Sequence, residues 1–246
     1  MYNFFVDNSS VIDNGYKIIG KDYNHIKNVL RMKVGEEVLV TYNGISDLCE
    51  IINFDNLAVI LSIKAPNYQN TELPIEIYLF QGLPKSDKFE FIIQKAVELG
   101  VKEIIPVEMK FCVAKIEEKK KAQKLERFNL ISESAAKQSK RNVIPKVSNV
   151  LTFNQAVEYA KGLDLFIVPY ECANGIEQTS SVISQIKKGM KVGVMIGSEG
   201  GFSDSEIELA KTSGAKIITL GKRILRTETA SITALSVIML KAETLY

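Results

Sequence analysis

From residue 75 onward, short apolar runs alternate with stretches in which apolar residues recur every three or four positions. The runs predict strands at residues 75–80, 104–107, 165–169, 192–196 and 215–220. The recurring stretches predict helices at residues 88–99, 117–139, 153–160, 203–214 and 230–240. Strands that alternate with helices favour a parallel α/β sheet.

The first part of the chain has a different pattern. Strand-like runs at residues 37–42, 46–54 and 57–63 follow one short helical stretch, Asp22–Arg31, and Asn43-Gly44 between the first two runs is typical of a hairpin turn. A polar segment, residues 67–72, and then Pro74 read as a linker. We therefore expect two domains, a small β-rich one at residues 1–68 and an α/β domain at residues 74–246.

Two glycine-containing loops follow predicted strands near the C-terminus, Ile196–Ser203 and Leu220–Ala230. Ser203 and Glu206 match a capping box that starts the next helix, and Gly214 is a suitable end for it. Thr227 is a candidate cap for the last helix. Such strand-to-helix corners are where open α/β sheets bind ligands, and the end of the strand at residues 165–169 is the expected third wall of the pocket.

The loop sequences narrow the ligand chemistry. Gly-Ser-Glu-Gly-Gly fits neither the dinucleotide fingerprint nor the P-loop, and Glu199 would repel a nucleotide phosphate, so a cationic or zwitterionic cofactor fits better. Lys222, Arg223 and Arg226 suit an anionic substrate. Two plainer interpretations remain open: a tight turn before a capped helix, and a solvated group of charges.

Charge and composition indicate which kinds of partner, compartment and site the protein can have. The net charge is only +2, but residues 110–146 carry eleven Lys or Arg against four Glu, which is typical of a nucleic-acid contact or of a solvated helix face. No apolar run is long enough to cross a bilayer and no leader is evident, which favours a cytoplasmic protein. Three separated cysteines, Cys49, Cys112 and Cys172, and a single histidine, His25, indicate neither a disulfide framework nor a metal site.

Taken in order, I-G-S-E-G-G-F-S and L-G-K-R-I-L-R-T-E-T-A resemble the RsmE family of 16S ribosomal RNA uracil-N3 methyltransferases, members of the SPOUT superfamily. The similarity extends over nearly the whole chain. Ser198 departs from it, because the family usually has proline there, and Tyr2-Asn3 stand where the family often has arginine. The resemblance implies a parallel sheet with a deep trefoil knot, an N-terminal PUA-like β-barrel for RNA, and a homodimer.

The resemblance also implies S-adenosylmethionine (SAM) as cofactor and 16S ribosomal RNA, or the small ribosomal subunit, as substrate. We expect Arg226 to stabilise the uracil anion, with Glu228 or Glu199 accepting the proton or orienting the arginine. The expected cofactor contacts are Ile196, Gly197, Gly200, Gly201, Leu220, Gly221, Ile224, Leu225, Thr229 and Ala230. The expected RNA contacts are Arg31, Lys33, Lys85, Arg141 and Arg223.

Two alternatives compete with this interpretation. The first is a SPOUT methyltransferase that acts on a ribose 2′-hydroxyl or on tRNA. The second is a non-catalytic RNA-binding or ribosome-assembly protein that kept the fold. Mapping the modified nucleotide would separate the first alternative, and a failure to bind SAM would favour the second.

Overall fold

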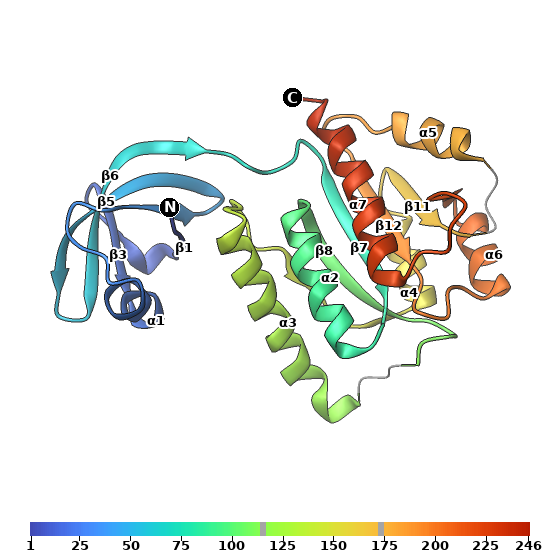
Figure 1. Ribbon diagram of the computed structural model, residues 1–246, viewed down its shortest axis with the longest axis horizontal. Coiled ribbons are helices and arrows are strands. Elements are labelled where there is room, and N and C mark those ends of the chain that lie inside the picture. The colour runs from blue at the N-terminus through green and yellow to red at the C-terminus, as the bar shows by residue number, and fades with distance from the viewer. Residues whose placement is uncertain (114–116, 172–174) are drawn as a thin grey trace. The chain divides into compact units, whose positions relative to one another are not determined.

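The computed structural model describes residues 1–113, 117–171 and 175–246 (Figure 1). These residues form two compact units. The first consists of Met1–Glu72 together with Ala136–Val143, and the second of Leu73–Ala135 together with Ile144–Tyr246. Cys49 and Cys112 are free thiols, and Cys172 lies outside the described residues.

The first unit is a curled, mixed sheet in the order β1-β4-β5-β6-β3-β2. Only the β1–β4 pair is parallel. Its elements are β1 (Asn3–Phe5), η1 (Asn8–Ser10), β2 (Val11–Ile12), β3 (Gly15–Ile19), α1 (Gly20–Asn24), η2 (His25–Val29), β4 (Glu37–Tyr42), β5 (Ile45–Asp55) and β6 (Ala58–Gln69). A core that includes Ile26, Val38 and Ile51 fills its inner face.

The predicted hairpin is present, with Asn43 and Gly44 both at positive φ between β4 and β5. The single helix expected at Asp22–Arg31 is instead a short α-helix followed by the π-helical turn η2. Strand β6 is longer than predicted and takes in the start of the expected linker.

The segment at residues 136–143 returns to the first unit and is fixed there by buried polar contacts. The Arg141 side chain is only 4% exposed, and its Nε donates to Glu72 Oε1 at 2.8 Å. Asn142 Nδ2 donates to Ser46 Oγ at 3.0 Å, while the Asn142 N–H donates to Glu72 Oε1 at 2.7 Å. The prediction of Arg141 as an RNA contact is therefore wrong, because its buried guanidinium is already paired with Glu72.

The second unit is a parallel sheet in the order β10-β8-β7-β12-β11-β13, with β9 also paired to β8. Its elements are β7 (Glu76–Gly82), α2 (Ser86–Glu98), β8 (Val101–Glu108), α3 (Glu118–Gln138), β9 (Lys146–Val147), β10 (Leu151–Thr152), α4 (Phe153–Ala160), β11 (Leu165–Pro169), α5 (Ile176–Ser184), β12 (Lys191–Ile196), α6 (Asp204–Thr212), β13 (Lys216–Ile218) and α7 (Thr227–Glu243).

Helices cover both faces of this sheet, so its strands are apolar throughout rather than alternating. On one face, α4 and α6 pack on a core that includes Phe80, Phe166 and Met195. On the other face, α2 and α7 lie side by side, as Figure 1 shows. The predicted fold class, a parallel α/β sheet preceded by a small β-rich unit, is confirmed; the knot stays a prediction.

Most predicted elements of the second unit are present, and β11 and α4 have the predicted bounds. Helix α5 was not predicted, because it is short and only three of its nine residues are apolar. Strand β13 is shorter than the apolar run at residues 215–220, since Thr219 and Leu220 already belong to the loop that follows.

Candidate functional site

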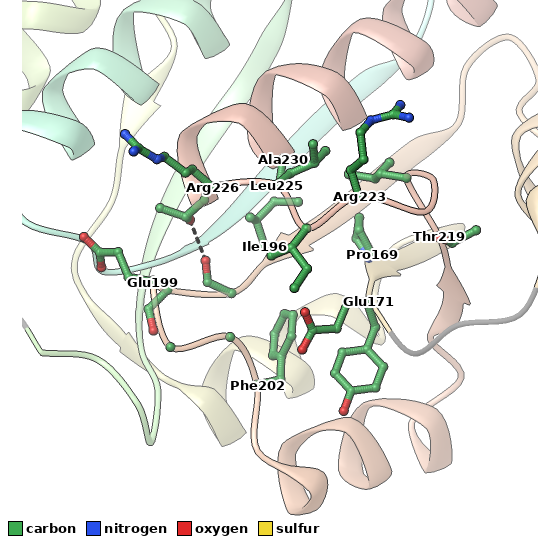
Figure 2. A pocket seen from close by; sticks show the side chains of 18 of the residues that line it. Pro169, Glu171, Ile196, Glu199, Phe202, Thr219, Arg223, Leu225, Arg226 and Ala230 are labelled. Atoms are coloured by element: carbon green, nitrogen blue, oxygen red, sulfur yellow. Dashed lines mark hydrogen bonds between the residues drawn. The ribbon is translucent and has the colours of Figure 1, made fainter.

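A cavity of about 490 Å³ lies at the carboxyl ends of β11, β12 and β13, beside the first turn of α7 (Figure 2). Its volume is in the range of small-molecule sites. The lining comes from the ends of three strands and from two helices: Lys88, Pro169, Tyr170, Glu171, Ile196, Gly197, Ser198, Glu199, Gly200, Gly201, Phe202, Thr219, Leu220, Gly221, Arg223, Ile224, Leu225, Arg226, Thr227 and Ala230. The predicted third wall after β11 is confirmed.

The first corner, Ile196–Ser203, is a tight turn at the end of β12. The N–H of Gly201 donates to the carbonyl of Ser198 at 3.0 Å, and Gly201 has φ +69°, a conformation that favours glycine. A Cβ on Gly200 would come within 2.6 Å of Phe111 Cβ. Glycine at these positions therefore permits the turn and its close packing on Phe111.

The predicted capping box holds the end of this corner. Ser203 Oγ donates to Glu206 Oε2 at 2.9 Å, and the Ser203 N–H donates to the same oxygen at 2.8 Å. The other oxygen, Glu206 Oε1, accepts from the N–H of Lys110 at 2.8 Å. Glu206 thus starts α6 and also attaches the segment after β8 to the first corner.

Glu199 is held by two partners at the mouth of the cavity. Its Oε1 accepts from the N–H of Lys85 at 3.2 Å and from Lys88 Nζ at 3.3 Å. Burial opposes ionisation of this carboxyl, but hydrogen bonds from the backbone N–H groups of Lys85 and of Glu199 itself, together with Lys88, outweigh burial and lower its pKa. A carboxylate with a lowered pKa is a poor proton acceptor at neutral pH.

Lys88 Nζ also lies 3.9 Å from Glu228 Oε2. Within the described residues, Glu228 Oε2 and Ser198 Oγ are buried side-chain oxygens without a hydrogen-bond partner. Neither Glu199 nor Glu228 forms an ion pair with Arg226 there, so the expectation that one of them orients the arginine is not met in this geometry.

The second corner, Thr219–Arg226, is held mainly at its start. The Thr219 N–H donates to Thr179 Oγ1 at 3.1 Å, and Thr179 Oγ1 donates to the Thr219 carbonyl at 2.8 Å. Further along, Ile224 is 84% exposed. The side chains of Arg223 and Arg226 point to opposite sides in Figure 2, and neither forms an ion pair within the described part of the chain.

A buried network joins the first corner to the end of β7 and to the start of α7, which follows directly on the second corner. Gln81, at the end of β7, is fully buried, and its Nε2 donates to Thr227 Oγ1 at 2.9 Å. Thr227 Oγ1 donates to the carbonyl of Gly197 at 2.6 Å. Ser231 Oγ donates to Gln81 Oε1 at 2.5 Å. Three segments that are far apart in the sequence are thereby fixed to one another.

Thr227 was expected to cap α7, and this prediction is wrong. The N-cap position belongs to Arg226, which makes no side-chain capping bond, and Thr227 is the first residue of the helix. Its hydroxyl donates instead to the buried carbonyl of Gly197 in the first corner, which Gln81 Nε2 also approaches at 3.5 Å.

The structure brings together most of the predicted site residues and separates others. All predicted cofactor contacts line the cavity except Thr229, which is exposed on α7. Arg226, Glu199 and Arg223 also line it, while Glu228 and Lys85 lie beside it. Arg31, at φ +54°, and Lys33 belong to the first unit, where both are exposed.

Sequence reasoning missed three residues of the site, namely Gln81, Lys88 and Thr179. Gln81 carries a weak signal, because it is a polar residue at the end of a strand that is otherwise apolar. Lys88 looked like an ordinary residue of an amphipathic helix.

Within the described residues, no group of three His, Cys, Asp or Glu side chains is arranged to hold a metal ion, and no helix is long and apolar enough to span a membrane.

Comparisons with known proteins agree with this geometry. The family model for the RNA methyltransferase domain matches residues 71–239, and the model for the RNA methyltransferase PUA domain matches residues 18–63. Ribosomal RNA small subunit methyltransferase E of Bacillus subtilis is 36% identical over 94% of this chain and 91% of its own length. The enzyme of the same name from Mesomycoplasma hyopneumoniae is 36% identical over 94% of this chain and 96% of its own length.

Two similar solved structures contain bound SAM. Ribosomal RNA small subunit methyltransferase E from Neisseria gonorrhoeae, bound to SAM, has a TM-score of 0.80 at 26% identity and covers 98% of this chain and 97% of its own. A candidate methyltransferase from Legionella pneumophila, also with bound SAM, has a TM-score of 0.81 at 30% identity and covers 97% and 96%. The chain therefore belongs to the family of ribosomal RNA small subunit methyltransferase E.

Proposed function

We propose that the protein transfers a methyl group from SAM to N3 of a uridine in 16S ribosomal RNA of the small ribosomal subunit. The observation that carries this proposal is the cavity at the strand ends, with its two glycine-containing corners, in a chain that is 36% identical over 94% of its length to a ribosomal RNA methyltransferase. A second class of target, a ribose hydroxyl or tRNA, has no comparable support.

The residues that line the cavity fit SAM. The backbone of Gly197 and Gly201 allows close approach, and Ile196, Leu220 and Leu225 supply an apolar wall for a nucleoside. Glu199, kept ionised by Lys85 and Lys88, places a negative charge at the mouth, which suits a cationic sulfonium ligand. When bound, SAM supplies an electrophilic methyl group.

Uracil N3 must lose its proton before it can accept that methyl group. A fixed cation next to the base favours the anion and stabilises the charge that develops on its carbonyl oxygens. Arg226 lies on the cavity wall between the second corner and α7, and its guanidinium has no carboxylate partner among the described residues. Its charge is therefore available to the substrate.

Two carboxylates were candidates for accepting the N3 proton, and their surroundings separate them. Glu199 has both a lowered pKa and two hydrogen-bond donors, which make it a weak base. Glu228 Oε2 has no hydrogen-bond partner, and its nearest cation, Lys88 Nζ, is 3.9 Å away. We assign the proton to Glu228 and a cofactor-orienting role to Glu199.

The decisive experiment combines cofactor binding with mapping of the product. The purified protein is titrated with SAM in a calorimeter and then incubated with SAM and unmodified small subunits or 16S ribosomal RNA. Saturable binding and one new N3-methyluridine, located by mass spectrometry, are the expected results. A methyl group on a ribose or on tRNA would replace the proposed target. Absence of SAM binding, with and without RNA, would favour the non-catalytic alternative.

Arg226→Ala tests the proposed mechanism. Loss of a cation that acts on the developing charge should lower kcat roughly 100- to 1000-fold, while the dissociation constant for SAM stays within a factor of about three. Lys222→Ala removes the same charge from the same corner and should change kcat less than about threefold. Full turnover by Arg226→Ala would overturn the assignment.

Two further features are part of the proposal. The first unit, as a PUA-like RNA-binding domain, would hold the RNA through Arg31 and Lys33.

A second copy of the chain would cover the apolar side chains that α7 exposes, Val237 and Leu240. Light scattering during size-exclusion chromatography would give the expected dimer mass. Because its substrate is ribosomal, we place the protein in the cytoplasm.

A further inference from the structure

An aromatic side chain is displayed at the edge of the first corner, outside the cavity. The N–H of Cys112 donates to the carbonyl of Met109 at 3.1 Å, which closes a turn with Lys110 and Phe111 at its tip. The N–H of Lys110 is held by Glu206, and Phe111 packs on Gly200. The tip is therefore tied to the corner on two sides.

Phe111 is not buried by this packing. It is 44% exposed. Single exposed apolar residues are common on protein surfaces, so it is the position of Phe111 against the first corner that sets it apart. Lys110 Nζ lies 5.8 Å from the centre of the Phe111 ring, and Lys110 has no carboxylate partner in the part of the chain that the structure describes. Proteins that bind single-stranded nucleic acid use aromatic rings for stacking together with nearby cations that face the phosphates.

We propose that Phe111 is a stacking platform for a base of the RNA that flanks the methylated uridine, with Lys110 facing the neighbouring phosphate. The inference rests on the proposed function, because it needs an RNA strand at the mouth of the cavity. A base rather than the cofactor is the partner, since Phe111 does not line the cavity, although it packs on Gly200, which does.

The chain contains a matched control for this ring. Phe91, on α2, is 41% exposed and has Lys95 Nζ 5.8 Å from its ring centre, so its exposure and cation geometry nearly equal those of Phe111. Two features distinguish the rings: Lys95 Nζ is paired with Glu98 at 2.9 Å, whereas Phe111 packs on Gly200 of the first corner.

The experiment measures KM and kcat for unmodified small subunits, together with the dissociation constant for SAM. Phe111→Leu keeps an apolar contact with Gly200 but removes the ring. It should raise KM roughly 10- to 100-fold, with kcat within about threefold and SAM affinity unchanged. Phe111→Tyr should restore the KM of the parent protein. Phe91→Leu should leave all three quantities at parental values.

The results distinguish failure of the stacking platform from failure of the proposed function. An unchanged KM for Phe111→Leu, or a KM no higher than that of Phe91→Leu, would overturn the stacking platform. A loss of SAM affinity without a rise in KM would also overturn it, because Phe111 would then only support Gly200. If the parent protein itself methylates no uridine, the proposed function fails before Phe111 is tested.

Discussion

The two corners that enclose the cavity are built in opposite ways. The first corner, at the end of β12, is fixed from several directions, by Thr227, Glu206 and Phe111. The second corner is fixed at Thr219 and then runs through exposed residues, with Ile224 almost fully accessible. A ligand would therefore meet one wall that is already in place and one wall with few internal contacts.

This difference separates what each corner contributes. A substitution in the network behind the first corner should change both the stability of the second unit and its ligand affinity. A substitution in the exposed part of the second corner should change affinity while stability stays the same. Three substitutions test this contrast, and their expected effects on the free energy of unfolding decrease in the order given.

The largest effect is expected for Gln81→Leu. It removes the donor to Thr227 and the acceptor for Ser231 in a fully buried position, where each unmet polar group costs roughly 1–3 kcal/mol. The free energy of unfolding should fall by about 2–3 kcal/mol, and SAM affinity should fall more than about tenfold. Urea denaturation and calorimetry measure the two quantities.

Gln185→Leu is the control for that change. Gln185 is an exposed glutamine whose Nε2 donates to the Ser181 carbonyl at 3.3 Å, so its replacement should change stability by less than about 0.5 kcal/mol. Equal effects of the two substitutions would show that the buried network does not hold the corners together.

A smaller effect is expected for Gly201→Val. A valine at φ +69° is strained by roughly 1–2 kcal/mol, and its side chain would enter the space that the first corner leaves for a ligand. Stability should fall by that amount and SAM affinity by more than about 100-fold. Gly189→Val, at φ +83° and remote from the cavity, should lose similar stability and keep its affinity. Equal losses of affinity would contradict the assignment of Gly201 to the cofactor wall.

The smallest effect on stability is expected for Ile224→Ser. Because Ile224 is 84% exposed, the free energy of unfolding should change by less than about 0.5 kcal/mol. SAM affinity should nevertheless fall roughly three- to tenfold, since a bound nucleoside would cover this side chain. Val34→Ser, at a residue that is 59% exposed in the first unit, should change neither quantity. A large loss of stability in Ile224→Ser would mean that the second corner is as firmly built as the first.

The features predicted correctly from the sequence are those that a few neighbouring residues determine. The capping box of Ser203 and Glu206 and the Asn43-Gly44 turn are examples, because their hydrogen bonds and backbone angles are local. The two corners were also found locally, since in each of them glycine follows directly on an apolar run that forms a strand.

The parts that were missed depend on contacts across the fold. Gln81 and Thr227 meet only after β7 and β12 pair, with Gln81 opposite Ile196, so the chain itself gives no spacing that links them. Thr227 was predicted as a helix cap because its sequence neighbours fit one. In the fold, its hydroxyl instead donates to the carbonyl of Gly197, which is far away in sequence. The burial of Arg141 likewise follows from Glu72, far away in sequence.

The pairing of Glu72 with Arg141 determines when the first unit can be completed during translation. The first unit contains Ala136–Val143, so its last residues emerge 71 positions after Glu72 has been added to the chain. At about 5–20 residues per second, roughly 4–14 s pass between these two events. During that interval, the carboxylate of Glu72 lacks its hydrogen bond from Arg141, and the Ser46 hydroxyl lacks its hydrogen bond from Asn142. The first unit, although its sheet is made first, is completed only after Leu73–Ala135 of the second unit have been translated.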